Sequence, residues 1–132
     1  MEPADLAALR DLLPLAVTLG IELIGASPDE VQGRLPWAHE LTTTSDVMHG
    51  GAIMSLADTC GGICAYLNLP QDARETATIE SKTNFLRAVR DGAATAVTRP
   101  LHRGRTLIVL ETEVQRADGR LAAKVTQTQV FH

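Results

Sequence analysis

His49, Gly50 and Gly51 stand together at the start of the longest apolar stretch of the chain. Two glycines let a ligand approach the backbone closely, and the free N–H groups in the first turn of a helix attract an oxygen that carries negative charge. These three residues therefore have the outline of an oxyanion site. The glycines would equally allow a sharp turn from a loop into a helix, so this second interpretation stays open.

Asp58 follows the histidine by nine positions and lies in the most hydrophobic segment, close to Leu56, Ala57 and Cys60. Carboxylates are almost never fully buried without a partner or a purpose. A carboxylate that is incompletely solvated is also a stronger base than an exposed one. Asp58 is therefore a candidate general base or nucleophile. The alternative is a polar side chain that faces solvent or caps an interface.

The elements that must position these groups follow from periodicity and turn signals. Leucines at helical spacing predict a short helix over residues 4–13, which Pro14 ends, and the apolar segment 50–69 predicts a long helix that is buried on most sides. Partly alternating segments at 20–24 and 30–37 predict a β-hairpin, which a loop at 40–48 follows. After the long helix, four segments rich in Thr, Val, Ile and Leu predict the strands of an antiparallel meander, at 74–88, 92–101, 105–116 and 120–131. The economical arrangement is an α+β fold in which one antiparallel sheet wraps around the long helix.

Length and composition exclude several classes of protein. The 132 residues provide one domain, and 45% hydrophobic with 21% charged residues is typical of a globular chain. Aromatic residues make up only 3% and the net charge is -4, so the chain lacks the stacking and basic surfaces that nucleic acid requires. No apolar run reaches the roughly 18 to 20 residues of a membrane span, and the first residues are acidic where a signal peptide is basic. We expect a cytoplasmic protein with no nucleic-acid or membrane partner.

Cys60 and Cys64 are the two cysteines, and no third or fourth metal ligand lies near them in the sequence. A structural zinc site needs four ligands. We therefore expect buried free thiols and no metal site.

Three stretches of the chain together resemble a known family. HGGAIMSLAD, TIESKTNFLRAV and LHRGRTLIVLETEV are similar to segments of the hotdog-fold acyl-CoA thioesterases of the phenylacetate-degradation (PaaI) type. The resemblance extends over roughly residues 15–131. It implies a single hotdog domain over residues 1–132, with an antiparallel sheet wrapped around one central helix. It also implies hydrolysis of an aryl- or medium-chain acyl-CoA thioester to the free acid and coenzyme A, without a cofactor.

Matched residue by residue, the resemblance implies that the Gly50 amide polarises the thioester carbonyl and that His49 shapes the site. Asp58 would be the nucleophile or the general base, and Thr78 would be the hydroxyl that orients water or the aspartate. Gly51 would contact the substrate. Such a mechanism is chemically sound, because fixed N–H donors stabilise the charge that the carbonyl oxygen gains in the transition state.

Two positions depart from the family pattern. Thr43 stands where many members have Asn, six residues before the histidine, and Asp46 stands where they have Gly. A Thr hydroxyl lacks the reach of an amide. Thr43 is therefore a candidate substrate-binding residue, with Thr42 or Thr44 as alternatives.

Thr78 poses a geometric question. Simple alternation along a strand places it on one face with Glu80 and Lys82, and such a polar face is ordinarily solvated. Its hydroxyl reaches the site only if a bulge or a subunit cleft intervenes. A solvated strand threonine is the alternative.

Arg103 and Arg105 belong to a basic cluster in an otherwise acidic protein. Arginine binds phosphate oxygens by bidentate contacts, and coenzyme A carries a 3′-phosphate and a pyrophosphate. We assign these two arginines to coenzyme A, with a solvated basic turn as the alternative.

Gly50 and Asp58 are too far apart to act on one carbonyl carbon from a single helix. Eight residues at a rise of 1.5 Å separate them by about 12 Å along the helix axis. Two antiparallel helices across a two-fold axis would bring Gly50 of one chain near Asp58 of the other, with Gly61 and Gly62 as room for close approach. We expect a homodimer with shared active sites, and the resemblance implies a further pairing into a homotetramer.

Two other functions remain as alternatives. A non-catalytic acyl-CoA-binding hotdog domain would gain nothing from a buried carboxylate beside an anionic ligand. A hydratase or dehydratase of the same fold has Asp and His separated by four residues, whereas Asp46 precedes His49 by only three.

Overall fold

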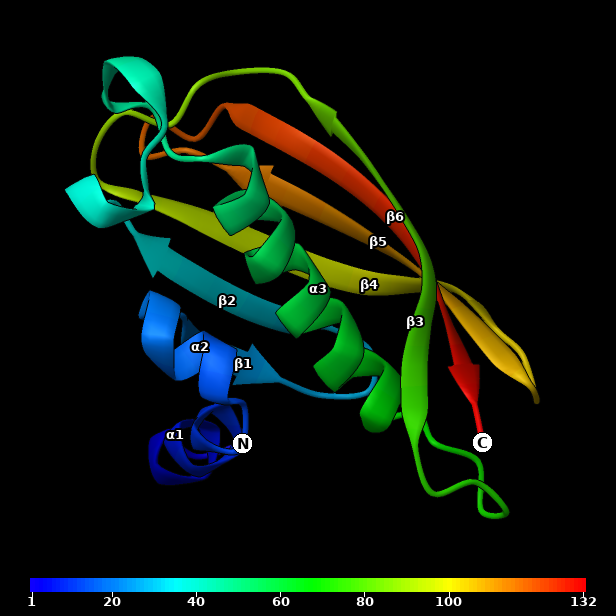
Figure 1. Ribbon diagram of the computed structural model, residues 1–132. Helices are drawn as coiled ribbons and strands as arrows, with labels where there is room; N and C mark the ends of the chain where they lie inside the picture. The colour runs from blue at the N-terminus through cyan, green and yellow to red at the C-terminus, as the bar shows by residue number, and fades with distance from the viewer.

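A long helix, α3 (Gly50–Tyr66), lies in the concave face of a curved six-stranded antiparallel sheet (Figure 1). The structure describes all 132 residues. The other elements are α1 (Pro3–Asp11), α2 (Pro14–Leu19), β1 (Glu22–Ala26), β2 (Val31–Pro36), β3 (Thr76–Phe85), β4 (Ala93–Arg103), β5 (Leu107–Gln115) and β6 (Leu121–Phe131), with short 3-10 turns at His39–Leu41 and Thr44–Asp46. The α+β hotdog architecture predicted from the sequence is confirmed.

The N-terminal region contains two helices where the sequence predicted one. Pro14 ends the first helix, as expected, but it also occupies the first turn of α2. Proline is favoured there because its missing N–H would be unpaired anyway and its fixed φ suits a helix. Gly20 then ends α2 in the left-handed conformation, with φ at 82°. Figure 1 shows α1 and α2 beside β1, at the opposite side of α3 from β3.

The strand order corrects the predicted meander. The order is β1-β2-β4-β5-β6-β3, so only β4, β5 and β6 form a meander, and β3 pairs with the outer edge of β6. After α3 the chain has crossed to the far side of the sheet, and β3 takes the edge that lies there (Figure 1). The β1–β2 hairpin is present as predicted, and β2 pairs with β4. The outer edge of β3 has no partner strand.

The long helix is buried on all but one row of side chains. Leu56, Ala57, Cys60 and Cys64 are fully enclosed against the sheet. The opposite row, at intervals of four residues, stays open and consists of Met54, Asp58, Gly62 and Tyr66. We call these four residues the open row. The prediction of a helix that is buried on most sides is therefore confirmed, and the open row is its uncovered face. None of the helices has the length and apolar character required to cross a membrane.

Candidate active site

Asp58 and Thr78 meet at the open row of α3. The Thr78 hydroxyl donates a hydrogen bond to the Asp58 carboxylate, with 2.8 Å between Oγ1 and Oδ1. The Asp58 side chain is exposed in the single chain, so the expectation that the carboxylate is poorly solvated is wrong at this level. The reason is the placement of Asp58 on the open row, which the sheet does not cover. The alternative of a polar side chain that faces out from the chain describes this arrangement better.

A β-bulge turns Thr78 toward the helix. The register of β3 against β6 shifts between Thr78 and Glu80. An extra residue in one strand reverses the alternation beyond it. Thr78 and Phe85, which are an odd number of residues apart, consequently both face α3: Thr78 contacts Asp58, and the Phe85 ring lies against Gly50. A bulge was one of the two features, with a subunit cleft, that the sequence analysis named as necessary for Thr78 to reach the site.

Asp58 and Thr78 line an open cavity of about 610 Å³ between the N-terminal helices and the far end of α3. Its polar lining residues are Asp58, Thr59, Arg74, Glu75, Thr76, Thr78 and Gln129. Its apolar lining is formed by Leu9, Leu12, Leu13, Leu15 and Ala16, with Ile63 and Tyr66 from α3. This space, the Asp58 cavity, places a carboxylate beside a surface suited to a hydrocarbon or aryl group.

Gln129 is a site residue that the sequence analysis did not identify. Its side-chain Nε2 donates to Thr78 Oγ1 at 2.5 Å, and Gln129 itself is only 1% exposed. The residue is directly opposite Thr78 in the register of β3 and β6. A signal was available, because Gln127 and Gln129 share the inward face of β6 with Val125 and Phe131. Two amides at successive core positions of a strand indicate a specific hydrogen-bonding role.

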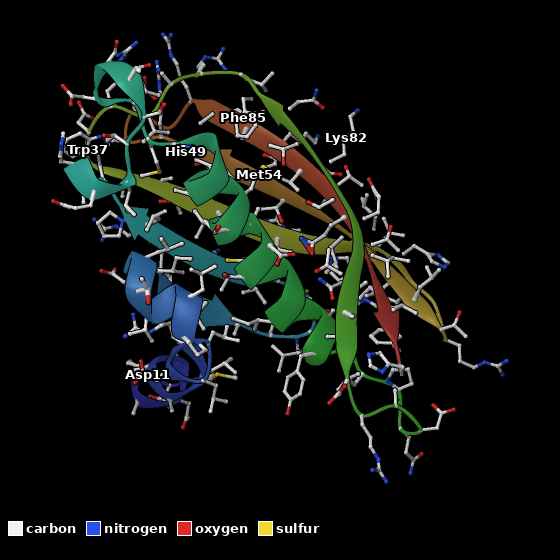
Figure 2. All side chains as sticks on the ribbon, viewed as in Figure 1. Asp11, Trp37, His49, Met54, Lys82 and Phe85 are labelled. Atoms are coloured by element: carbon white, nitrogen blue, oxygen red, sulfur yellow. The ribbon has the colours of Figure 1, made fainter.

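His49 caps the N-terminus of α3. Its Nδ1 accepts a hydrogen bond from the Gly51 N–H at 2.7 Å. The Gly51 N–H is therefore already used within the chain. The Gly50 N–H donates to no group of the chain and remains available to a substrate oxygen. Figure 2 shows His49 and Phe85 at this end of α3, with Met54 further along the helix.

A second, smaller cavity of about 240 Å³ adjoins this helix start. Its walls include Thr42, His49, Gly51 and Ser55, together with Leu15, Leu19, Glu40, Leu41 and Ala52. Thr42, whose hydroxyl donates to the His39 carbonyl at 2.7 Å, lines this His49 cavity, whereas Thr43 is exposed outside it. Of the alternatives that the sequence left open, Thr42 is the threonine next to His49.

Asp46 adopts a left-handed backbone conformation, which glycine, the residue that the resemblance implies at this position, enters without strain. Its φ is 58°, in the left-handed region, and the preceding Ser45 has a φ of 64°. Side chains are disfavoured there, although Asp tolerates the conformation better than most residues. The loop before His49 therefore follows a glycine-type path without the glycine.

Arg103 and Arg105 lie at the end of the β4–β5 hairpin and do not line the Asp58 cavity. The Arg103 guanidinium forms an ion pair with Asp29 at 2.6 Å. Arg105 is exposed and forms no ion pair within the chain. Within one chain, these arginines are thus separate from Asp58 and Thr78.

The small residues and thiols of α3 serve packing. A side chain at Gly61 would overlap the carboxamide of Gln127, so this glycine makes room for a strand of the same chain and not for a partner helix. Gly62 has open space around it. Burial raises the pKa of the Cys60 thiol to about 12 and that of Cys64 to about 11, which keeps both thiols neutral and unreactive at pH 7.

Comparison with known proteins agrees with the fold. Residues 46–123, more than half of the chain, match the family described as the Thioesterase superfamily. The chain is 37% identical over 106 residues to the protein SSO2140 of Saccharolobus solfataricus, which covers 80% of this chain and 74% of that protein.

Two solved structures are also similar. A crystal structure of a variant of thioesterase PA1618 from Pseudomonas aeruginosa has a TM-score of 0.90 at 25% identity, over 99% of this chain and 94% of that one. The PaaI protein from the phenylacetic acid degradation operon of E. coli has a TM-score of 0.85 at 20% identity, over 96% of this chain and 89% of that one, and shares the fold. The chain therefore belongs to the thioesterase superfamily, and it is a thioester hydrolase with the hotdog fold.

Proposed function

We propose that the chain hydrolyses aryl- or medium-chain acyl-CoA thioesters to the free acid and coenzyme A. The observation that carries this proposal is the hydrogen-bonded pair of Asp58 and Thr78 at the wall of an apolar cavity. A volume of about 610 Å³ lies within the usual range for small-molecule sites, and leucines of α1 and α2 provide an apolar surface for the acyl group.

The mechanism uses a donor at the helix start and a carboxylate in its middle. The Gly50 N–H stabilises the charge that the thioester carbonyl oxygen gains in the transition state, an effect worth a few kcal/mol where water is excluded. Asp58 either removes a proton from water that attacks the carbonyl carbon, or attacks that carbon itself to give an anhydride that water then hydrolyses. In both routes the C–S bond breaks and coenzyme A leaves as the thiolate. Thr78 holds the carboxylate in position through its hydroxyl. Thr43, or Thr42 at the His49 cavity, assists in placing the substrate.

Two subunits share each active site in this proposal. Asp58 lines the Asp58 cavity, Gly50 lines neither cavity, and the two residues are about 12 Å apart along α3. The unpaired edge strand β3 carries Ile79 and Phe85, which are 60% and 51% exposed, and Met54 of the open row is 40% exposed. A second copy packed against β3 and the open row would cover this apolar surface and bring its Gly50 toward Asp58. A further pairing of such dimers into a homotetramer is the assembly that we propose.

We assign the binding of coenzyme A to Arg103 and Arg105, which are exposed at the end of the β4–β5 hairpin. Arg105 is free of ion pairs within the chain, and its guanidinium is suited to the phosphate groups of the nucleotide end. The cytoplasmic location expected from the sequence stays a prediction.

An assay of thiol release from a panel of acyl-CoA substrates tests the function. Asp58→Asn keeps the size of the side chain but removes the base or nucleophile, so hydrolysis should fall by at least about 10². Asp72→Asn is the matched control, because Asp72 is an exposed aspartate outside the Asp58 cavity. Full activity of Asp58→Asn would overturn the assignment. Binding of acyl-CoA without release of thiol by the unaltered chain would favour a binding domain instead.

A further inference from the structure

We propose that Gln129 is a positioning residue of the thioesterase reaction, which directs the hydroxyl proton of Thr78 toward Asp58. The inference rests on the proposed role of Asp58. Gln129 lies on β6, behind Thr78 as seen from the carboxylate, and acts only through Thr78. Its partner in this task is Gln127, two residues earlier on the same face of the strand.

The direction of each hydrogen bond follows from the charge of Asp58. An ionised carboxylate only accepts hydrogen bonds, so the contact at 2.8 Å requires the single proton of the Thr78 hydroxyl. The Thr78 oxygen can then only accept in its contact with Gln129 at 2.5 Å. Gln129 must therefore present its NH₂ group, and not its carbonyl, to Thr78.

The amide of Gln129 is fixed in the required orientation by its other contacts. Its Oε1 accepts a hydrogen bond from the Thr76 hydroxyl at 3.0 Å, and its second N–H donates to Gln127 Oε1 at 3.0 Å. A rotated amide would turn its carbonyl toward Thr78. The hydroxyl would then donate to Gln129 and leave Asp58 without this hydrogen bond. The orientation of one buried amide thus decides where the Thr78 proton points.

Burial indicates that this arrangement has a purpose. Gln127 is fully buried, and its Nε2 has no hydrogen-bond partner in the chain. Val125 and Phe131 occupy the same face of β6, so apolar residues fit this strand. An unpaired buried N–H is costly, and natural cores contain few of them. The chain nevertheless has two glutamines at core positions where apolar side chains would pack. Gln127 is hydrogen-bonded to Gln129, and Gln129 is hydrogen-bonded to the Thr78 hydroxyl that contacts Asp58.

A double-mutant cycle separates positioning from simple packing. Gln129→Leu should lower kcat for acyl-CoA hydrolysis about tenfold with little change in KM, because the loss falls on the reacting carboxylate. Thr78→Ser keeps the hydroxyl, so Gln129→Leu should cause the same loss in that background. Thr78→Val removes the hydroxyl, and Gln129→Leu should then cause no further loss.

The control is the buried pair Thr98 and Thr112, whose hydroxyls are hydrogen-bonded to each other at 2.6 Å without a link to Asp58. Replacing both by Val perturbs buried polar groups of the sheet and should leave kcat unchanged. If circular dichroism shows that Gln129→Leu does not fold, Gln129→Met replaces it in the cycle. Methionine is closer in shape to glutamine and also lacks the amide.

The outcomes distinguish this inference from the proposed function. An undiminished kcat in Gln129→Leu, or an equal loss in the Thr78→Val background, would overturn the role of Gln129 while Asp58→Asn remains inactive. Full activity of Asp58→Asn would instead overturn the function assigned to Asp58. The inference is supported only if the loss depends on the hydroxyl of residue 78.

Discussion

Gly61→Ala tests whether the buried Gln127 side chain leaves space for a methyl group at position 61 of α3. A methyl group at this position would overlap the carboxamide of Gln127. A long side chain can often move aside, but Gln127 is fully buried and hydrogen-bonded to Gln129. The methyl group must therefore displace a side chain that is fully buried and held by a hydrogen bond.

The magnitude follows from two opposing effects. Overpacking of a core costs about 1–3 kcal/mol, and the severe overlap here places the cost near the upper end. Alanine regains about 1 kcal/mol over glycine in a helix interior. The net loss in the free energy of unfolding is therefore about 2 kcal/mol. With an unfolding entropy of about 2.1 cal/mol/K per residue, this loss lowers Tm by about 7 °C for a chain of this length.

Thermal and urea denaturation at one fixed protein concentration measure the change, since an oligomer has a concentration-dependent Tm. The matched partner is Gln127→Ala: in that background Gly61→Ala should be neutral or stabilising, because the obstructing amide is gone. Gly25→Ala is the control, since nothing lies within 4 Å of a methyl group there. A Gly61→Ala protein as stable as the original, or an equal loss in both backgrounds, would refute the reasoning.

Three further predictions concern the core, the loop and the substrate. Burial raises the Cys60 pKa from 9.0 to about 12, so the folded state keeps a proton that the unfolded chain loses. This thiol should therefore lower the free energy of unfolding by about 1.4 kcal/mol per pH unit above pH 9. In urea denaturation at pH 8 to 11, Cys60→Ala should remove this contribution to the slope and leave that of Cys64, whose pKa burial also raises. Asp46→Gly should raise stability by about 1 kcal/mol, since glycine carries no penalty at a φ of 58°, and a lower Tm would contradict this. Replacing Arg103 and Arg105 by Ala should raise KM for acyl-CoA but spare a short thioester without the nucleotide, whereas equal losses on both substrates would make the arginines structural.

The fold was largely predictable because its signals are local. Hydrophobic periodicity and turn residues marked α3 and all six strands, and a single sheet around one helix was the arrangement that covers them. The place of β3 in the sheet was not predictable in the same way, because the apolar pattern of the strand fits a position beside β4 as well as the observed position beside β6. Which edge a strand joins depends on where the preceding helix delivers the chain.

The site was predicted in its parts but not in its connections. His49, Gly50 and Asp58 were identified from their types and spacing, and the structure places His49 at the N-cap of α3 and the other two within the helix, as expected. The contact between Asp58 and Thr78 depends on a β-bulge, and no residue of β3 indicates this bulge in the sequence. The exposure of Asp58 was visible in principle, because the row of Met54, Asp58, Gly62 and Tyr66 repeats every four residues. A pattern of that kind marks one face of a helix, but the sequence does not say that this face is the uncovered one.

Subunit exchange tests the shared active site most directly. Asp58→Asn removes the carboxylate, and Gly50→Pro removes the N–H at the first position of α3, where proline is compatible with a helix. Each protein alone should be inactive. In a mixed dimer, one site carries both changes and the other carries none. Equal amounts of the two proteins, exchanged at random, should therefore regain about a quarter of the original activity per chain. If heterodimers form, as native mass spectrometry would establish, and hydrolysis remains absent, Gly50 and Asp58 do not act together across subunits and the account is wrong.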